Sequence, residues 1–352
     1  MKNSLKMSFI VWLVVDLFMI ASTAAWGFTG KSNPGKKHVK VMIISMFPPE
    51  RDVWFKYLQG PWQKIIVPGL SAEFPAVVCN MDEICLITTG MGHANAAASM
   101  MALTFSPSFD LQDTYFLVAG ISGIDPRRGT LGTAAWAKYI VDFSIQWEID
   151  GRQLPAGWKT GYLGVVTNGP DEKPGLIYGT EVFKLNSQLS DTAVALSRKV
   201  TLADSPQAQA ARAKYDYSPA NQSPTITQCD SLSGDTWWSG SPIDERARKW
   251  MSLMTDGQGI YCTTQQEDNA TYEALRRAAK AGRVDLARVA MLRTGGNFNT
   301  PYDGESNAEN LMNFEAKGGF PIAVENLYRA ANPLIRDIVN HWNEWHQGIP
   351  RR

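Results

Sequence analysis

The stretch YFLVAGISGIDPRRGTLGTAAWAKYIVD, residues 115–142, decides the fold class expected for this chain. It opens with an apolar run too short to span a membrane, contains Gly120 and Gly123, crosses a polar turn at 125–128 and resumes as a second apolar run. This order predicts a strand, a glycine turn and a second strand. Glycines at the end of a buried strand let another group approach the backbone closely, because no Cβ intervenes. The plainer alternative is an ordinary tight loop in a large sheet.

The composition is that of a folded protein with a large core. Of the 352 residues, 44% are hydrophobic, which is enough for one large domain or two modest ones. Lys plus Arg and Asp plus Glu both number 34, and no long run of one sign occurs. Nothing in this charge balance favours nucleic-acid binding, and we expect no nucleic-acid partner.

The amino-terminal residues predict an export signal. Two lysines precede an apolar run at 9–20 and a stretch of small residues at 21–25. We expect cleavage near the end of residues 1–25 and a periplasmic or secreted protein. Asp16 within the apolar run leaves a weak signal or an uncleaved anchor as alternatives. No other segment approaches the roughly 20 apolar residues that a spanning helix needs, so no transmembrane domain is expected.

Export determines how the four cysteines are interpreted, because an oxidising compartment favours disulfides. Cys79 and Cys85 flank NMDEI in a predicted hairpin, which favours a short-range bond and leaves Cys229 with Cys262. Zinc is the competing interpretation. The chain has no CxxC motif and only four scattered histidines, so we expect no metal and no other cofactor.

Predicted strands and helices alternate along the chain, which favours one three-layer α/β domain over residues 38–352. Residues 203–228, rich in Ala, Gln, Ser and Pro, predict a surface excursion, and 294–304 predict a loop. Strands are expected at 38–47, 75–79, 84–88 and 284–293, and helices after Glu50, after Gly92, at 181–200, at 243–254, after Asn269 and at 320–345.

Two strand ends carry candidate binding groups. Glu50 follows the first buried strand, where open α/β sheets bind ligands, although a carboxylate that interacts with a helix dipole is the simpler explanation. TTGMGHANAAASMMAL, which begins at Thr88, runs from a strand through Gly90 and Gly92 into a helix whose free N–H groups can hold a phosphate, carboxylate or sugar hydroxyl. Asn95 stands at the third glycine position of the dinucleotide motif, which disfavours a Rossmann cofactor site.

Two further stretches have a functional and a structural explanation. The paired tryptophans of CDSLSGDTWWSG, Trp237 and Trp238, suit stacking on a flat heterocycle or filling the core. The polar run 266–269 opens a helix. Such residues are usually caps, and Thr263 or Thr264 with Glu267 approximates a capping box, but a sugar diol needs the same hydrogen-bond acceptors.

Together these motifs resemble the nucleoside phosphorylase and nucleosidase superfamily. More closely, GISGIDPRRGTLGTAAWA, GDTWWSG, TTQQEDNATYEAL and LRTGGNFNTPYDG resemble the purine nucleoside permease family, over most of the chain from about residue 38 to the C-terminus. The resemblance implies a three-layer α/β/α sandwich of the nucleoside phosphorylase type, with a central mixed sheet flanked by helices. It also implies a purine nucleoside ligand, with phosphate as a second candidate, and a homodimer or homotrimer.

The resemblance implies roles for individual residues. Glu50 lies where nucleosidases place the carboxylate that activates water, Glu267 aligns with the glutamate that binds the ribose hydroxyls, and Asn297 falls where an Asp or Asn contacts the purine. Because Asn cannot donate a full proton, Asn297 implies hydrogen bonding and a preference for 6-oxopurines. The other implied substrate-binding residues are Thr89, Gly90, Gly92, Gly120, Gly123, Trp238, Asp268, Asn269 and Arg293.

The implied function is cleavage of the N-glycosidic bond of purine nucleosides through an oxocarbenium-like transition state. Arg51 and Arg293 are the only arginines near the motifs that would suit phosphate, which favours hydrolysis over phosphorolysis. The alternative is a nucleoside-binding protein without catalysis that serves uptake.

Overall fold

The computed structural model describes residues 35–351, so the predicted signal at 1–25 lies outside the described residues. Two buried central strands, β2 (Val41–Ser45) and β7 (Tyr115–Ile124), show how the layers form. Val41 and Ile43 of β2 pack into one hydrophobic cluster, and Met42 and Ile44 pack into the other. Successive side chains of a strand point to opposite faces, so an unbroken apolar strand needs a cover of helices on each face.

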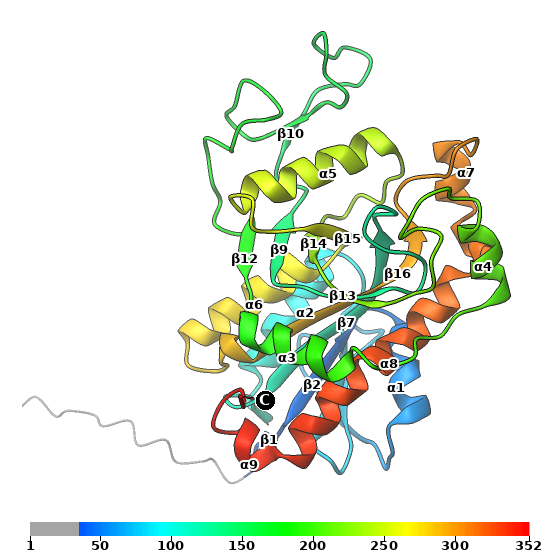
Figure 1. Ribbon diagram of the computed structural model, residues 1–352. Coiled ribbons are helices and arrows are strands. Elements are labelled where there is room, and N and C mark those ends of the chain that lie inside the picture. Colours follow the sequence, from blue (N-terminus) through cyan, green and yellow to red (C-terminus); the bar gives the residue numbers. More distant parts are fainter. Residues whose placement is uncertain (1–34, 352) are drawn as a thin grey trace, which may run out of the picture. The chain divides into compact units, whose positions relative to one another are not determined.

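Helices cover both faces of the sheet (Figure 1). On the face of Met42 and Ile44 lie α2 (His93–Phe105) and α6 (Asp268–Lys280), which pack against each other. On the opposite face lie α1 (Pro48–Tyr57), α3 (Ser187–Ser197) and α8 (Gly319–Asn340). The remaining helices are α4 (Pro206–Arg212), α5 (Ser241–Met254), α7 (Asn307–Met312), α9 (Trp342–Trp345), η1 (Leu286–Arg288) and η2 (Phe314–Lys317).

The main sheet is mixed, and its strand order is β12-β9-β14-β15-β7-β2-β5-β4-β3, with β16 paired to β7 and β8, and β8 paired to β13. Pairs β1–β6 and β10–β11 form two small separate sheets. The predicted three-layer fold with a mixed central sheet is therefore confirmed. The other strands are β1 (Lys37–His38), β3 (Gln63–Ile66), β4 (Ala76–Cys79), β5 (Ile84–Thr88), β6 (Phe109–Asp110), β8 (Ala134–Trp136), β9 (Tyr139–Asp142), β10 (Trp147–Glu148), β11 (Tyr162–Leu163), β12 (Val182–Lys184), β13 (Ile226–Gln228), β14 (Asp230–Ser233), β15 (Tyr261–Gln265) and β16 (Val289–Phe298).

Two predicted strand ends were wrong. Gly120 and Gly123 do not form a turn, because β7 continues through both glycines to Ile124 and the turn follows it. Strand β16 does not stop at Arg293 but continues to Phe298. The two strands pair in parallel over this whole length, with a register shift between Gly295 and Asn297, and this pairing outweighs the low strand preference of glycine.

Two other segments also differ from expectation. The predicted helix at 181–200 begins with strand β12, and only Ser187–Ser197 is helical, capped by the side chain of Asn186. Residues 203–228 lie mainly at the surface, as expected, but they are not without regular structure. They contain α4 and β13 and bury Ala208 and Tyr215 in a hydrophobic cluster.

Both predicted disulfides are present, Cys79–Cys85 between the paired strands β4 and β5, and Cys229–Cys262 between the start of β14 and β15. In residues 35–351 no helix is both long enough and apolar enough to span a membrane.

Candidate functional site

The site lies where one edge of β7 loses its neighbour. Strand β16 pairs with β7 along one edge, from Phe116 to Ile124. On the other edge, β2 pairs with residues 115–118 and β15 with Gly123 and Ile124 only. Residues 119–122 therefore face a gap between the end of β2 and the end of β15. Crevices at the carboxyl ends of parallel strands are the usual ligand sites of α/β sheets.

Glu50 fills this gap with its carboxylate. One oxygen accepts a hydrogen bond from the backbone N–H of Met46 at 2.8 Å, and the other accepts from the N–H of Ile121 at 2.7 Å. Glu50 lies in the first turn of α1, which begins with two prolines directly after β2. Its side chain thus connects the main chains of β2 and β7 where these strands separate.

The Glu50 carboxyl is 1% exposed, and this burial raises its pKa to about 8. The positive charge of Arg293 opposes the shift, the negative charge of Glu267 adds to it, and the two backbone N–H groups oppose it. Glu50 is therefore a carboxyl group that exchanges its proton close to neutral pH.

Arg293 of β16 reaches across β7 to the same gap. Its guanidinium donates to the carbonyl oxygen of Ile121 at 3.1 Å, to Asp268 at 2.6 Å and to Glu267 at 3.1 Å. The guanidinium passes directly over Gly120, where a Cβ would lie 2.5 Å from one of its nitrogens. Burial lowers the pKa of Arg293, but the Asp268 and Glu267 carboxylates outweigh this and raise it.

Glu267 is held at the start of α6 between three donors. Besides Arg293, these are the N–H of Gly92 at 3.1 Å and that of Gln266 at 3.3 Å. The helix is capped by Gln265, whose side-chain oxygen accepts from the N–H groups of Glu267 and Asp268 at 2.6 and 2.9 Å. The predicted capping box is absent here, and the Glu267 carboxylate faces the cavity instead.

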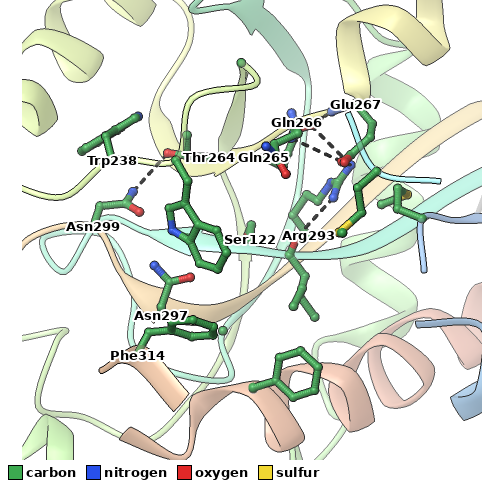
Figure 2. A pocket seen from close by; sticks show the side chains of 18 of the residues that line it. Ser122, Trp238, Thr264, Gln265, Gln266, Glu267, Arg293, Asn297, Asn299 and Phe314 are labelled. Atoms are coloured by element: carbon green, nitrogen blue, oxygen red, sulfur yellow. Dashed lines mark hydrogen bonds and ion pairs between the residues drawn. The ribbon is translucent and has the colours of Figure 1, made fainter. Parts of the chain in front are cut away.

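The cavity has a volume of about 250 Å³ and two chemically different ends. Figure 2 shows Gln265, Glu267 and Arg293 at one end, and Trp238, Phe314 and the asparagines at the other. Trp237 packs against Phe314 with ring centroids 4.8 Å apart. An aromatic end beside a charged end suits a ligand with a flat ring and a hydroxylated part.

Two asparagines at the end of β16 line the aromatic end. Within residues 35–351, Asn297 has one weak side-chain hydrogen bond, from Nδ2 to the Phe298 carbonyl at 3.5 Å. Asn299 is held more firmly, since its Nδ2 donates to the Tyr261 hydroxyl at 2.5 Å and to Thr264 Oγ1 at 3.1 Å.

The structure brings many of the sequence-predicted site residues to one cavity. Glu50, Gly123, Trp238, Glu267, Arg293 and Asn297 line it. Gly120 lies beneath Arg293, Asp268 holds Arg293 in place, and Gly92 donates to Glu267.

Thr89, Gly90 and Asn269 do not line this cavity. The Thr89 hydroxyl donates to the carbonyl of Gly90 at 2.8 Å. The Asn269 side chain donates to the carbonyl of Thr180 at 2.7 Å. Ligand binding by these three residues stays a prediction.

Sequence reasoning missed several lining residues. Asn299 carries a usable signal, because it lies two positions after Asn297, directly beyond the end of β16. Met46 and Phe47 precede Glu50, and Gln265 precedes Glu267, but no motif singles them out. Phe314 and Phe320 lie far along the chain from the predicted site residues and have no local signal. Within residues 35–351, no three His, Cys, Asp or Glu side chains are grouped to hold a metal ion.

Comparison with known proteins gives a consistent result. Residues 38–350 match the family described as purine nucleoside permease (NUP). A purine nucleoside permease of Candida albicans is 40% identical over 310 residues, covering 87% of this chain and 76% of that protein. A probable purine nucleoside permease of Schizosaccharomyces pombe is 38% identical over 349 residues, covering 96% and 98%.

Solved structures show the same fold at low identity. Futalosine hydrolase of Helicobacter pylori superposes with a TM-score of 0.53 at 11% identity, covering 85% of this chain and 98% of that chain. The 5'-methylthioadenosine/S-adenosylhomocysteine nucleosidase of the same organism gives 0.50 at 11% identity, covering 84% and 98%.

Proposed function

The chain belongs to the purine nucleoside permease family, and on this premise we propose that it binds purine nucleosides in the cavity and hydrolyses their N-glycosidic bond. A nucleoside-binding role agrees with the names of its relatives and with a cavity that has an aromatic and a charged end. Hydrolysis is the finer part of the proposal and depends on the state of Glu50.

The observation that carries the proposal is the buried Glu50 carboxyl with a pKa of about 8. A general base is most effective when its pKa lies near the working pH, and this carboxyl is shifted toward that range by its surroundings. Perturbed carboxyls inside a cavity are also typical of functional sites. Glu50 would take a proton from the attacking water.

The other groups bind and orient the nucleoside. The purine stacks at the aromatic end, near Trp238 and Phe314, and Asn297 hydrogen-bonds the ring edge. Glu267, which Arg293 and the N–H of Gly92 hold in place, accepts hydrogen bonds from the ribose hydroxyls. The purine leaves with the electron pair of the broken bond, the hydrogen bond from Asn297 stabilises its negative charge, and it takes a proton from solvent to become the free base.

Water suits this site better than phosphate as the nucleophile. Arg293 is the one cationic side chain among the described residues that line the cavity. Its guanidinium is already engaged by Asp268, Glu267 and the Ile121 carbonyl. A phosphate dianion would therefore meet the Glu50 and Glu267 carboxyls without a free cation to bind it.

The test is incubation of the protein with adenosine, guanosine and inosine, with and without phosphate, followed by chromatography. Free base and ribose in the absence of phosphate are expected. If ribose 1-phosphate forms, and only when phosphate is present, the reaction is phosphorolysis and the proposal of hydrolysis is wrong. Intact nucleoside recovered at saturating protein, together with measurable binding, would refute both reactions.

The second candidate function is a nucleoside-binding component of uptake that performs no chemistry. The relatives' designation as permeases favours it. If the protein only binds nucleosides, a Glu50→Gln variant should still support their uptake in cells. If uptake requires hydrolysis to the free base, the same variant should lose uptake.

We also propose that the protein is exported, as one domain from residue 38 onward that assembles into a homo-oligomer. The two disulfides support export, since such bonds persist in oxidising compartments. Intact mass of the protein recovered outside the cytoplasm tests removal of residues 1–25, and light scattering tests the dimer or trimer.

A further inference from the structure

Asn299 is held in one orientation by a closed triangle of hydrogen bonds. Its Nδ2 contacts both the Tyr261 hydroxyl and Thr264 Oγ1, and these two hydroxyls are 2.7 Å from each other. Figure 2 shows the side of the triangle between Asn299 and Thr264. Tyr261 and Asn299 are buried and Thr264 is half-buried, so the contacts lie inside the protein.

Counting protons determines which way the Asn299 amide faces. Three contacts need three protons, and two hydroxyls supply at most two. The Tyr261 hydroxyl keeps its proton, because burial and the nearby Asp244 carboxylate raise its pKa. The third proton must come from Asn299, and only its NH₂ group has protons. An amide turned by 180° would leave one contact without a proton.

The Asn299 carbonyl oxygen consequently points away from the triangle. It lies over Gly123, where a Cβ would be 2.0 Å from Oδ1. Gly123 and Asn299 both line the cavity. Among residues 35–351 no donor is hydrogen-bonded to this oxygen. Asn299 therefore offers a ligand an acceptor and no donor.

Asn297 has no such constraint. Its Nδ2 lies 3.5 Å from the position that a Cβ of residue 123 would take, and its contact with the Phe298 carbonyl is also 3.5 Å long. The Asn297 amide can turn and present either a donor or an acceptor. Discrimination between purines cannot depend on Asn297 alone.

We propose that Asn299 determines specificity by accepting a hydrogen bond from the 6-amino group of the purine, so that the preferred substrates are 6-aminopurine nucleosides. The inference rests on the proposed function, since it assumes a purine in this cavity. The 6-amino group donates to Asn299 while N7 accepts from Asn297, and amide side chains pair with this edge of adenine in other recognition sites.

A 6-oxopurine meets the opposite situation. Its O6 atom would face Asn299 Oδ1, which places two acceptors together and leaves both without a donor in a buried site. The preference for 6-oxopurines that Asn297 implied is thus replaced by one that Asn299 determines. Tyr261 acts as a positioning residue, because it holds the amide and does not itself line the cavity, and Thr264 holds the amide from the cavity wall.

The test uses carbocyclic analogues of adenosine, purine riboside and inosine. A CH₂ group replaces their ring oxygen, so they lack a cleavable glycosidic bond, and calorimetry measures binding whether or not the protein is an enzyme. The adenosine analogue is expected to bind about 10-fold more tightly than the purine analogue, and the inosine analogue more weakly still.

Two variants test the mechanism of this selection. Asn299→Ala should lower affinity for the adenosine analogue to that of the purine analogue, with no loss for the inosine analogue. Tyr261→Phe frees the amide to turn and should narrow the ratio between adenosine and inosine analogues while both still bind. Asn340→Ala, on the exposed end of α8, is the matched control and should leave the order unchanged.

The proposal is overturned if the inosine analogue binds the wild-type protein as tightly as the adenosine analogue, if no analogue binds, or if both variants, shown to be folded by thermal melting, keep the wild-type ratio. Base release from ordinary adenosine is measured separately. If adenosine is cleaved but the analogues bind without selectivity, only the role of Asn299 is refuted. If the analogues bind selectively but adenosine is not cleaved, only hydrolysis is refuted.

Discussion

Glu50 is the residue whose ionisation determines the proposed reaction. Only its carboxylate form can take a proton from water, so kcat/KM should rise with pH to a midpoint near 8 and then level off. Glu50→Gln should lower kcat by about 100-fold or more and remove this rise. Initial rates of base release between pH 6 and 9 measure both. Asp52→Asn, an exposed carboxylate on the same helix, is the control, and a wild-type profile without this rise would contradict the assignment.

The same carboxyl makes stability depend on pH. Its pKa of about 8 in the folded protein lies above the ordinary glutamate pKa of 4.5, so the folded state binds the extra proton. The stability that this proton contributes to the folded state is fully present below about pH 4.5 and is lost as pH rises through 8. Between pH 5 and 9, wild-type unfolding free energy should fall by up to about 4 kcal/mol relative to that of Glu50→Gln. Urea titrations at several pH values measure the difference, and parallel curves for the two proteins would exclude it.

Glu267 should act on the sugar and not on the base. Glu267→Gln replaces a carboxylate that can accept at both oxygens by an amide that donates on one side, so affinity for carbocyclic adenosine should fall about 10-fold. The 2′-deoxy form should lose less, because it lacks one of the hydroxyls. Calorimetry compares the two ligands. Glu273→Gln, on the same helix, is the control and should not change the affinity for either ligand. Equal losses of affinity for both ligands in Glu267→Gln would reject the ribose role.

At the scale of elements, β7 is shaped by what crosses it. Gly120→Ala would place a Cβ 2.1 Å from the Met46 side chain, 2.5 Å from Arg293 and 2.9 Å from Glu50. The backbone of Gly120 has no positive φ, so the effect comes from displaced side chains. We expect about 10-fold or greater loss of base release and a destabilisation of about 1–3 kcal/mol. Gly151→Ala is the control: a Cβ at this position would meet no atom within 4 Å, so neither base release nor stability should change.

The same strands show what the sequence predicts and what it does not. Strand β2, helix α2 and the alternation of elements follow from apolar runs and their spacing. The lengths of β7 and β16 do not, because Gly120 and Gly295 disfavour strand locally. Their extended conformation results from pairing with each other across about 170 residues of sequence, which local patterns do not record.

The site follows the same division. Glu50, Glu267 and Asn297 were identified because each directly follows or interrupts a recognisable element and matches a family motif. Phe314 and Phe320 were not, since only the folded chain brings them to the cavity. The fixed orientation of Asn299 needs the Tyr261 and Thr264 hydroxyls, and their mutual distances exist only in three dimensions.

For the whole molecule, the two disulfides should contribute unequally. Cys229–Cys262 closes a loop with a sequence separation of 33 and Cys79–Cys85 one of 6. In the chain-entropy treatment these loops correspond to about 4 and about 2 kcal/mol. Replacing both members of each pair by alanine should lower the melting temperature more for Cys229 and Cys262. Calorimetric melting of the two double variants tests this, and a larger effect at Cys79 and Cys85 would contradict it.

The gap along one edge of β7 has a consequence for protein engineering. It arises because β2 and β15 stop pairing with β7 at different points, and Glu50 and Arg293 hydrogen-bond the backbone there. Substitutions at positions 297 and 299 should leave these backbone contacts in place, because neither side chain makes them. A library confined to these two positions and Trp238 would thus explore new heterocyclic ligands on an unchanged scaffold, while Glu50 and Arg293, which bind the backbone of the gap, would be kept.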